Sequence, residues 1–195
     1  MTKLILFVGT PGAGKSTLLA SVSEKYKDIR NINLGTEMLK VAKENLGIDN
    51  REDLGAMSDT DIKEQREIAF KNIIADKTDA FIDTHLTIKY GRRYVPGVTI
   101  DELRNIRISA IIYIDATAQE IWNRRKNDAT KPGRRNINDS VLEIDEHRSV
   151  NLAILSSCAI YLSIPIYIIY NSDGKQKEAV DELENIVKEH FYQNK

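Results

Sequence analysis

The chain has 195 residues, of which 42% are hydrophobic and 29% charged, and its formal net charge is -1. This length and composition indicate one folded globular domain, and the nearly balanced charge argues against a broad nucleic-acid surface. Cys158 is the single cysteine, which excludes an intramolecular disulfide and a cysteine metal cluster. No apolar run reaches the roughly 18 residues of a membrane span, and the first residues read as a core strand. We therefore expect a cytoplasmic protein without membrane contact.

Short apolar runs alternate with longer helical stretches along the chain. The runs are rich in β-branched residues, as buried parallel strands are, and the expected strands are 4–8, 29–34, 80–82, 109–114 and 164–170. The expected helices are 15–26, 36–46, 58–77, 118–127, 139–163 and 175–191. This alternation predicts an α/β fold: a single three-layer domain whose five-stranded parallel sheet is covered by helices on both faces.

A glycine-rich run, Gly9-Thr-Pro-Gly-Ala-Gly-Lys-Ser16, lies between the first expected strand and the first expected helix. Glycines in this context let backbone N–H groups turn toward phosphate oxygens, and the helix that follows adds its positive dipole end. Lys15 would bring a positive charge to the β- and γ-phosphates, and Ser16 would offer a hydroxyl to Mg²⁺. The run predicts a phosphate-binding loop for a nucleotide.

Two intervals interrupt the alternation, a helical excursion at about 35–77 and a polar segment at about 127–138. Basic residues crowd the second: between Arg124 and Arg135 there are six against one acid. Arginine matches phosphate oxygens with paired hydrogen bonds, so this segment suggests a mobile cover that places arginines over a triphosphate. A solvated charged loop is the alternative interpretation.

The third expected strand runs into Asp83-Thr-His85. Its end lies at the carboxyl edge of the sheet beside the phosphate loop, where acids commonly hold Mg²⁺ or its waters, although Asp83 could instead cap a turn. His85 could contact a substrate, or it could be a neutral histidine bonded to nearby backbone.

Taken in order, these motifs resemble those of the archaeal-type adenylate kinases. The resemblance rests on the phosphate loop, Leu34-Gly-Thr-Glu-Met38, Asn50-Arg-Glu-Asp53, Ile82-Asp-Thr-His85, Tyr94-Val-Pro-Gly97 and Arg124-Arg-Lys-Asn-Asp-Ala-Thr130, which span nearly the whole chain. It implies reversible, Mg²⁺-dependent conversion of ATP and AMP into two ADP, with an AMP-binding helical insertion at 35–77, a short lid at 127–138 and a trimeric homo-oligomer.

The resemblance also implies roles for individual residues. ATP would be bound by Gly9, Thr10, Pro11, Gly12, Ala13, Gly14, Lys15, Ser16, Thr17, Asp173 and Gly174. AMP would be bound by Gly35, Thr36, Arg51 and His85. The catalytic set would be Lys15, Asp83 and the lid arginines Arg124, Arg134 and Arg135, with Ser16 and Asp83 at the metal. Gly55 stands where the resemblance leads us to expect an arginine, and Arg66 or Arg92 is the candidate replacement.

Other functions fit the phosphate loop. One is a small-molecule kinase with a different acceptor, such as CMP, UMP or shikimate, and another is a nucleotide-hydrolysing switch. Against a GTPase, Ile114-Asp-Ala-Thr117 stands where a guanine-reading Asn-Lys-x-Asp motif would follow the fourth strand. A third is an assembly protein that uses the apolar stretch 152–169 as an interface, or that stretch belongs to the core.

Overall fold

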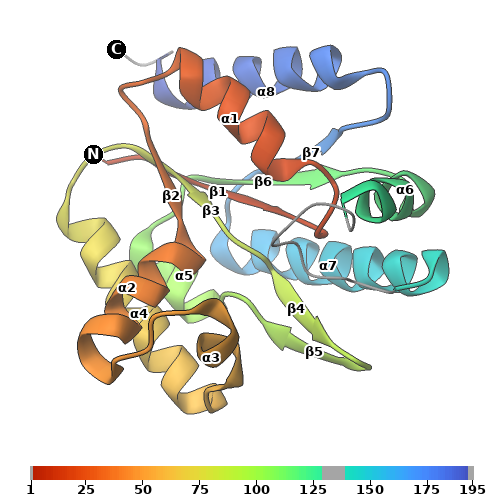
Figure 1. Cartoon of the computed structure of the whole chain (residues 1–195). Coiled ribbons are helices and arrows are strands. Elements are labelled where there is room, and N and C mark those ends of the chain that lie inside the picture. The colour runs from red at the N-terminus through yellow and green to blue at the C-terminus, as the bar shows by residue number, and fades with distance from the viewer. Residues whose placement is uncertain (1, 129–138, 193–195) are drawn as a thin grey trace.

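A twisted five-stranded parallel sheet forms the centre of the molecule (Figure 1). The structure is a computed structural model and describes residues 2–128 and 139–192. The strand order is β2-β3-β1-β6-β7. The strands are β1 (Leu4–Gly9), β2 (Arg30–Asn33), β3 (Ala80–Asp83), β6 (Ala110–Asp115) and β7 (Ile166–Tyr170). The predicted five-stranded α/β fold is therefore confirmed.

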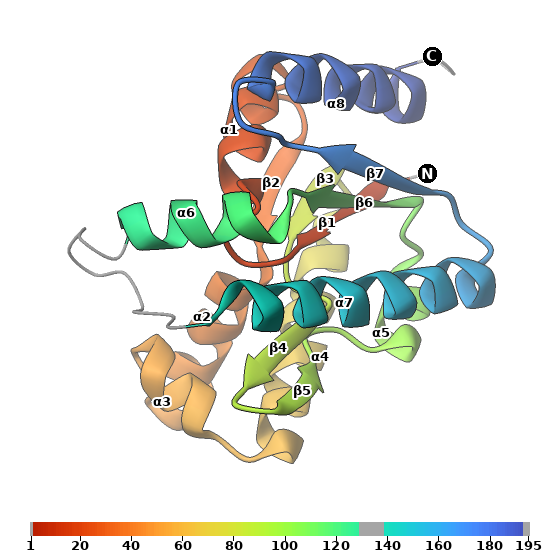
Figure 2. The ribbon, with the colours of Figure 1, turned by 90° about the vertical axis from the view of Figure 1, so that its right-hand side faces the viewer.

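Helices cover both faces of this sheet (Figures 1 and 2). One face packs against α1 and α8, and the other packs against α2, α4, α5 and α7. The helices are α1 (Lys15–Lys25), α2 (Leu34–Leu46), α3 (Arg51–Ala56), α4 (Asp59–Ala75), α5 (Ile100–Ile106), α6 (Ala118–Asp128), α7 (Val141–Leu162) and α8 (Gln176–Phe191). No helix in the described ranges is both long and apolar enough to span a bilayer.

Strand β1 shows why the sheet is buried on both faces. Leu4, Leu6 and Val8 join one apolar cluster, whereas Ile5 and Phe7 join the other. Successive side chains of a strand point to opposite faces, so a continuous apolar run supplies two cores at once. The glycine-rich loop that follows is consequently attached to a strand that is buried along its whole length.

Polar residues fix the beginnings of the helices around this core. Asn33, Ser58 and Ser140 each accept a backbone N–H from the first turn of α2, α4 or α7. At α7 the cap is reciprocal, because Glu143 accepts a bond from the backbone N–H of Ser140. Such caps satisfy N–H groups that have no partner within the helix.

The segment between β3 and β6 differs from the sequence-based expectation. No strand or helix was expected between residues 82 and 109, but an antiparallel hairpin lies there, formed by β4 (Thr87–Tyr90) and β5 (Arg93–Pro96). Helix α5 follows it, and α3 lies within the excursion between β2 and β3. These elements are short and partly polar, so they carry little of the apolar pattern by which strands and helices are recognised.

A tight backbone contact closes the base of the hairpin. Gly97 donates its N–H to Leu86, and a Cβ at Gly97 would collide with the backbone carbonyl of His85. We predict that Gly97→Ala lowers the free energy of unfolding by about 2 kcal/mol or more, because backbone atoms must move to make room.

The matched control is Gly91→Ala in the turn of the same hairpin. Gly91 has a φ of 60 degrees and open space around its Cβ position, so this change should cost only about 1 kcal/mol of left-handed strain. Denaturant titration of both variants measures the difference. Equal stability of the two variants would contradict the collision.

Candidate functional site

The glycine-rich loop, residues 9–16, connects β1 to α1 and is called the cradle below. Gly12 and Gly14 have φ values of 91 and 90 degrees, which residues with a Cβ rarely adopt. Gly9 is close to the neighbouring strand, because its Cβ would lie 2.5 Å from the backbone oxygen of Ile114. The exposed side chains of Ser16 and Thr17 follow in the first turn of α1. The loop thus presents free helix N–H groups and two hydroxyls at one point, as phosphate binding requires.

Lys15 and Asp83 form a buried ion pair beside this cradle. Strand β3 lies next to β1 with Phe7 opposite Asp83, which places the carboxylate at the carboxyl edge of the sheet. The Lys15 ammonium donates to Asp83 Oδ1, and both side chains are about nine-tenths buried. Burial lowers the pKa of Lys15 to about 8, so the ammonium stays charged at neutral pH.

Asn33 joins this ion pair to the helical excursion and was missed by the sequence analysis. It lies opposite Asp83 in the β2–β3 register, and its Nδ2 donates to Asp83 Oδ2 at 3.0 Å. Its Oδ1 accepts from Thr36 N at 3.0 Å and from an Arg51 terminal nitrogen at 3.2 Å. The only signal in the sequence is a polar residue at the end of an expected strand.

Three of the residues expected on the acceptor side meet at this point. Arg51 donates to Thr36 Oγ1 at 2.8 Å, and a Cβ on Gly35 would lie 3.6 Å from an Arg51 terminal nitrogen. Arg51 belongs to α3, whereas Thr36 belongs to α2, and the Arg51 side chain is exposed. An exposed guanidinium beside a hydroxyl and helix N–H groups is suited to bind a second phosphate.

His85 lies next to the cradle in its neutral form. Burial, with a smaller contribution from the nearby charge of Lys15, lowers the pKa of His85 to about 4. Its Nδ1 is buried and has no hydrogen-bond partner among the described residues. The imidazole therefore adds no charge near the phosphates at neutral pH, but it retains an unused polar atom.

Arg124 lies on the other side of the cradle, facing the segment after β7. It donates to the backbone oxygens of Ala13 at 3.2 Å and Asn171 at 2.7 Å, and to Asp173 Oδ1 at 2.5 Å. A hollow of about 190 Å³ opens here, lined by Gly14, Thr17, Arg124, Asn171, Ser172, Asp173, Gly174 and Gln176. Its place beside the loop suits a nucleoside, whereas a role of Arg124 at the transferred phosphate stays a prediction.

The remaining predicted residues fall into two groups. Arg134, Arg135 and most of the expected lid lie outside the described residues. Ser16 follows Lys15 in α1, and Asp83 is the ion-pair partner of Lys15. Their hydroxyl and carboxylate are oxygen donors of the kind that Mg²⁺ accepts beside phosphate oxygens. No cluster of three or more metal-ligating side chains occurs within residues 2–128 and 139–192. A metal held here would therefore depend on the ligand's own phosphates.

Comparisons with known proteins agree with this geometry. A family model described as an AAA domain matches residues 8–143. An adenylate kinase of Thermoplasma acidophilum is 34% identical over 183 residues, covering 93% of this chain and 97% of that protein. The chain belongs to the adenylate kinases. An adenylate kinase of Thermoplasma volcanium is 31% identical, with 94% of this chain and 98% of that protein covered.

The fold of this adenylate kinase is also similar to those of solved kinase structures. A shikimate kinase from Acinetobacter baumannii in complex with shikimate has a TM-score of 0.56 at 13% identity, covering 99% of this chain and 97% of that one. At this identity the match concerns the fold alone. The family is fixed by the sequence relatives.

The structure shows where the two candidates to replace the arginine expected at Gly55 lie. Arg66 is buried, and its Nε donates to Glu102 Oε1 at 2.7 Å while a terminal nitrogen donates to Pro96 O at 3.3 Å. It is therefore committed to joining α4, α5 and β5. Arg92 is exposed in the hairpin turn. Of the two, only Arg92 is placed to meet a ligand from solvent.

Proposed function

We propose that the protein catalyses reversible, Mg²⁺-dependent phosphoryl transfer from ATP to AMP, giving two ADP. The observation that carries this proposal is a pair of clusters, each with a cationic side chain, on either side of one carboxylate. The cradle with Lys15 lies on one side of Asp83, and Thr36 with Arg51 lies on the other, joined to it through Asn33. A hydrolase needs one such cluster, whereas a kinase with a phosphate acceptor needs two.

The donor would occupy the cradle. Residues Gly9 to Thr17 would hold its phosphates, and Lys15 would stabilise the moving phosphoryl group. The nucleoside would enter the hollow next to Asp173 and Gly174. Mg²⁺ would be held by Ser16 and by Asp83 or waters bound to it, where it neutralises phosphate charge.

The acceptor would bind between Gly35, Thr36, Arg51 and His85. The second ionisation of a nucleoside monophosphate lies near pH 6, so its phosphate is mostly a dianion at neutral pH and can attack without a strong general base. An acceptor oxygen then forms a bond to the γ-phosphorus, the bond to the β–γ bridging oxygen breaks, and ADP leaves with that oxygen. The neutral state of His85 is compatible with this step, because no proton has to be removed.

The protein's task in this reaction is to bring two polyanions into line and screen their repulsion. Lys15 and Arg51 approach from α1 and α3 on opposite sides of the Asn33–Asp83 pair. Positioning and fixed positive charge are the main means of catalysis in phosphoryl transfer. The arginines at 134 and 135 would complete the screen from the lid.

A kinase with a different phosphoryl acceptor is the second candidate function. Gly55 stands in place of an expected arginine, and Arg66 is occupied by Glu102. Because neither position supplies an arginine to the acceptor, the acceptor could be a different monophosphate or a small hydroxyl compound such as shikimate. A kinase for another acceptor would share the donor cradle and differ around Arg51.

Location and assembly are also part of the proposal. We infer a cytoplasmic enzyme that binds neither nucleic acid nor membranes and forms a homo-oligomer, for which a trimer is suggested by the family resemblance. Ile160 and Tyr161, which are 81% and 58% exposed at the end of α7, are compatible with such an interface. Sedimentation of the purified protein measures the subunit number directly.

The activity is tested by incubating the protein and Mg·ATP with AMP, CMP, UMP or shikimate in turn and separating the products by ion exchange. We expect two ADP for each AMP consumed and little product with the other acceptors. Loss of ATP at the same rate with and without an acceptor would identify a hydrolase instead.

Replacing Lys15 tests the donor side. We predict that Lys15→Ala lowers kcat by about 100-fold or more, because an ammonium aimed at the transferred phosphoryl is lost. Lys25→Ala on the exposed end of the same helix is the matched control and should keep its rate. Steady-state kinetics measures both, with circular dichroism as the check on folding. Near-normal turnover of the Lys15 variant would remove it from the mechanism.

Replacing Asn33 tests the acceptor side. Asn33→Ser keeps a residue that caps α2 well but is too short to join Asp83 to Arg51. We predict a rise of about tenfold or more in the KM for AMP, because a hydrogen-bonded charged group loses its support, with the KM for ATP nearly unchanged. Asn31→Ser, at an exposed position of the same strand, is the control. An equal rise in both KM values would contradict the assignment.

A further inference from the structure

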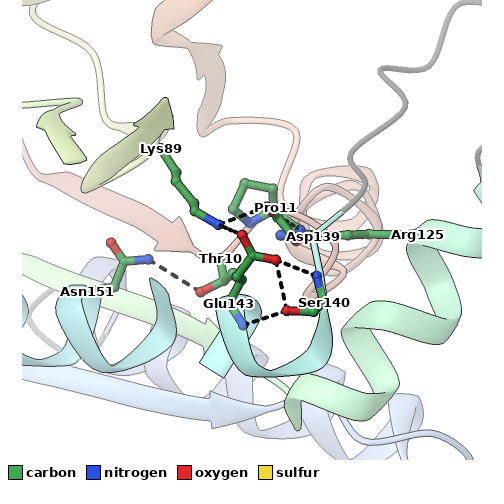
Figure 3. Close-up of polar contacts among 8 residues, drawn as sticks. All are labelled: Thr10, Pro11, Lys89, Arg125, Asp139, Ser140, Glu143 and Asn151. Carbon is green, nitrogen blue, oxygen red and sulfur yellow. Dashed lines mark hydrogen bonds and ion pairs between the residues drawn. The ribbon is translucent and has the colours of Figure 1, made fainter. Parts of the chain in front are cut away.

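Arg125 uses its guanidinium on the protein itself. Its Nε and one terminal nitrogen donate to the carbonyl oxygen of Pro11 at 2.9 and 2.7 Å, and its other terminal nitrogen donates to Asp139 Oδ2 at 2.8 Å (Figure 3). The side chain is 9% exposed. Although Arg125 belongs to the basic run that the sequence places over a triphosphate, it lies against the outside of the cradle.

The peptide geometry gives this contact a consequence. In a planar trans peptide the C=O and the following N–H point in opposite directions. Holding the Pro11 carbonyl toward Arg125 therefore turns the Gly12 N–H away from α6. The arginine also packs on the loop, because a Cβ on Gly12 would lie 3.1 Å from Arg125 Cγ. One side chain thus fixes both the orientation and the position of this peptide.

Asp139 is also held by Lys89 of β4. Its Oδ1 accepts from Lys89 Nζ at 2.9 Å, and Lys89 also donates to Glu143 Oε1 at 3.2 Å (Figure 3). Glu143 is anchored by the capping box at the start of α7, where its Oε2 accepts from the N–H and hydroxyl of Ser140. Contacts therefore run from Lys89 in β4 through Asp139, just before α7, and Arg125 in α6 to the cradle.

The charges in this cluster balance. Among residues 2–128 and 139–192, Arg125 and Lys89 face Asp139 and Glu143, so two cations meet two anions within hydrogen-bonding distance. Bonds from Ser140 and Lys89 lower the pKa of Glu143 to about 2, which keeps it ionised at neutral pH. A neutralised, mostly buried guanidinium has little attraction left for a phosphate. It is better suited to hold the protein than to bind the substrate.

We propose that Arg125 is a positioning residue of the donor site, which, braced by Asp139 and Lys89, holds the Pro11–Gly12 peptide with its N–H toward the donor phosphates. The inference rests on the proposed function, since it concerns the cradle of that donor. It predicts an effect on phosphate binding at the cradle and none at the acceptor cluster around Arg51.

The test compares binding of three probes by calorimetry: a non-hydrolysable Mg·ATP analogue, inorganic tripolyphosphate and AMP. In Arg125→Lys the ammonium keeps the charge but cannot hold Pro11 and Asp139 together as a guanidinium fork does. We expect the Kd values of the ATP analogue and of tripolyphosphate to rise about tenfold or more, because N–H donors leave their pre-set orientation, while the Kd of AMP changes less than about twofold. Arg104→Lys on the surface of α5 is the matched control and should leave all three Kd values unchanged.

Two further variants keep the proposal testable if Arg125→Lys is unstable. Asp139→Asn and Lys89→Met remove the contacts that hold Arg125 and leave Arg125 itself in place. Each should raise the Kd values of the ATP analogue and tripolyphosphate by a smaller factor than Arg125→Lys does. Asp139→Asn should add little in the Arg125→Lys background, because both act through one contact. Thermal unfolding of each variant accompanies the binding data.

Three results would overturn the inference: unchanged donor binding in Arg125→Lys, equal loss of donor and AMP binding, or additive effects of the two substitutions. Failure of the proposed function looks different, since the unmodified protein would then bind no ATP analogue or would make no ADP from ATP and AMP.

Discussion

The contact between Lys15 and Asp83 is the point from which the rest of the site is arranged. It exists because β3 lies between β2 and β1, so that the end of β3 meets the loop that leaves β1. The same strand register puts Asn33 beside Asp83 and brings the start of α2 to the cradle. The cluster around Lys15 and the cluster around Arg51 are neighbours for this reason. Ligands of open α/β sheets bind at such a carboxyl edge, where connections diverge to opposite faces.

The conformation of the cradle depends on side chains of α6 as well as on its own glycines. Arg124 contacts the carbonyl of Ala13 and Arg125 contacts that of Pro11, so adjacent residues of α6 hold alternate carbonyls of one loop. Carbonyls turned outward leave the N–H groups of the same peptides free for an anion. Glycine makes this conformation possible at Gly12 and Gly14, and the bonds from the two arginines stabilise it. Pre-organisation of this kind lowers the cost of binding, since little reorientation remains to be done.

The sequence predicts the parts of this site that depend on neighbouring residues. The apolar runs, the glycine spacing and the basic character of Lys15 are local, and the five sheet strands and the cradle follow from them. Contacts between distant segments do not. Asn33 meets Asp83 across 50 residues and Arg125 meets Pro11 across 114. A list of basic residues cannot separate Arg125, which holds a carbonyl, from one that faces a ligand, and Arg66 offers no sign of its buried partner Glu102. The β4–β5 hairpin was not predicted because its alternation of apolar and polar residues is short and is interrupted by Lys89 and Arg93.

The most direct measurement is a crystal structure with a dinucleotide in which five phosphates join two adenosines. Two clusters on either side of Asp83 predict that the phosphate chain runs from the cradle and Lys15 to Thr36 and Arg51, with one adenosine in the hollow beside Asp173 and the other next to α3. A chain that enters the cradle and leaves Arg51 facing solvent, with the second adenosine bound elsewhere or unbound, would contradict a two-anion site.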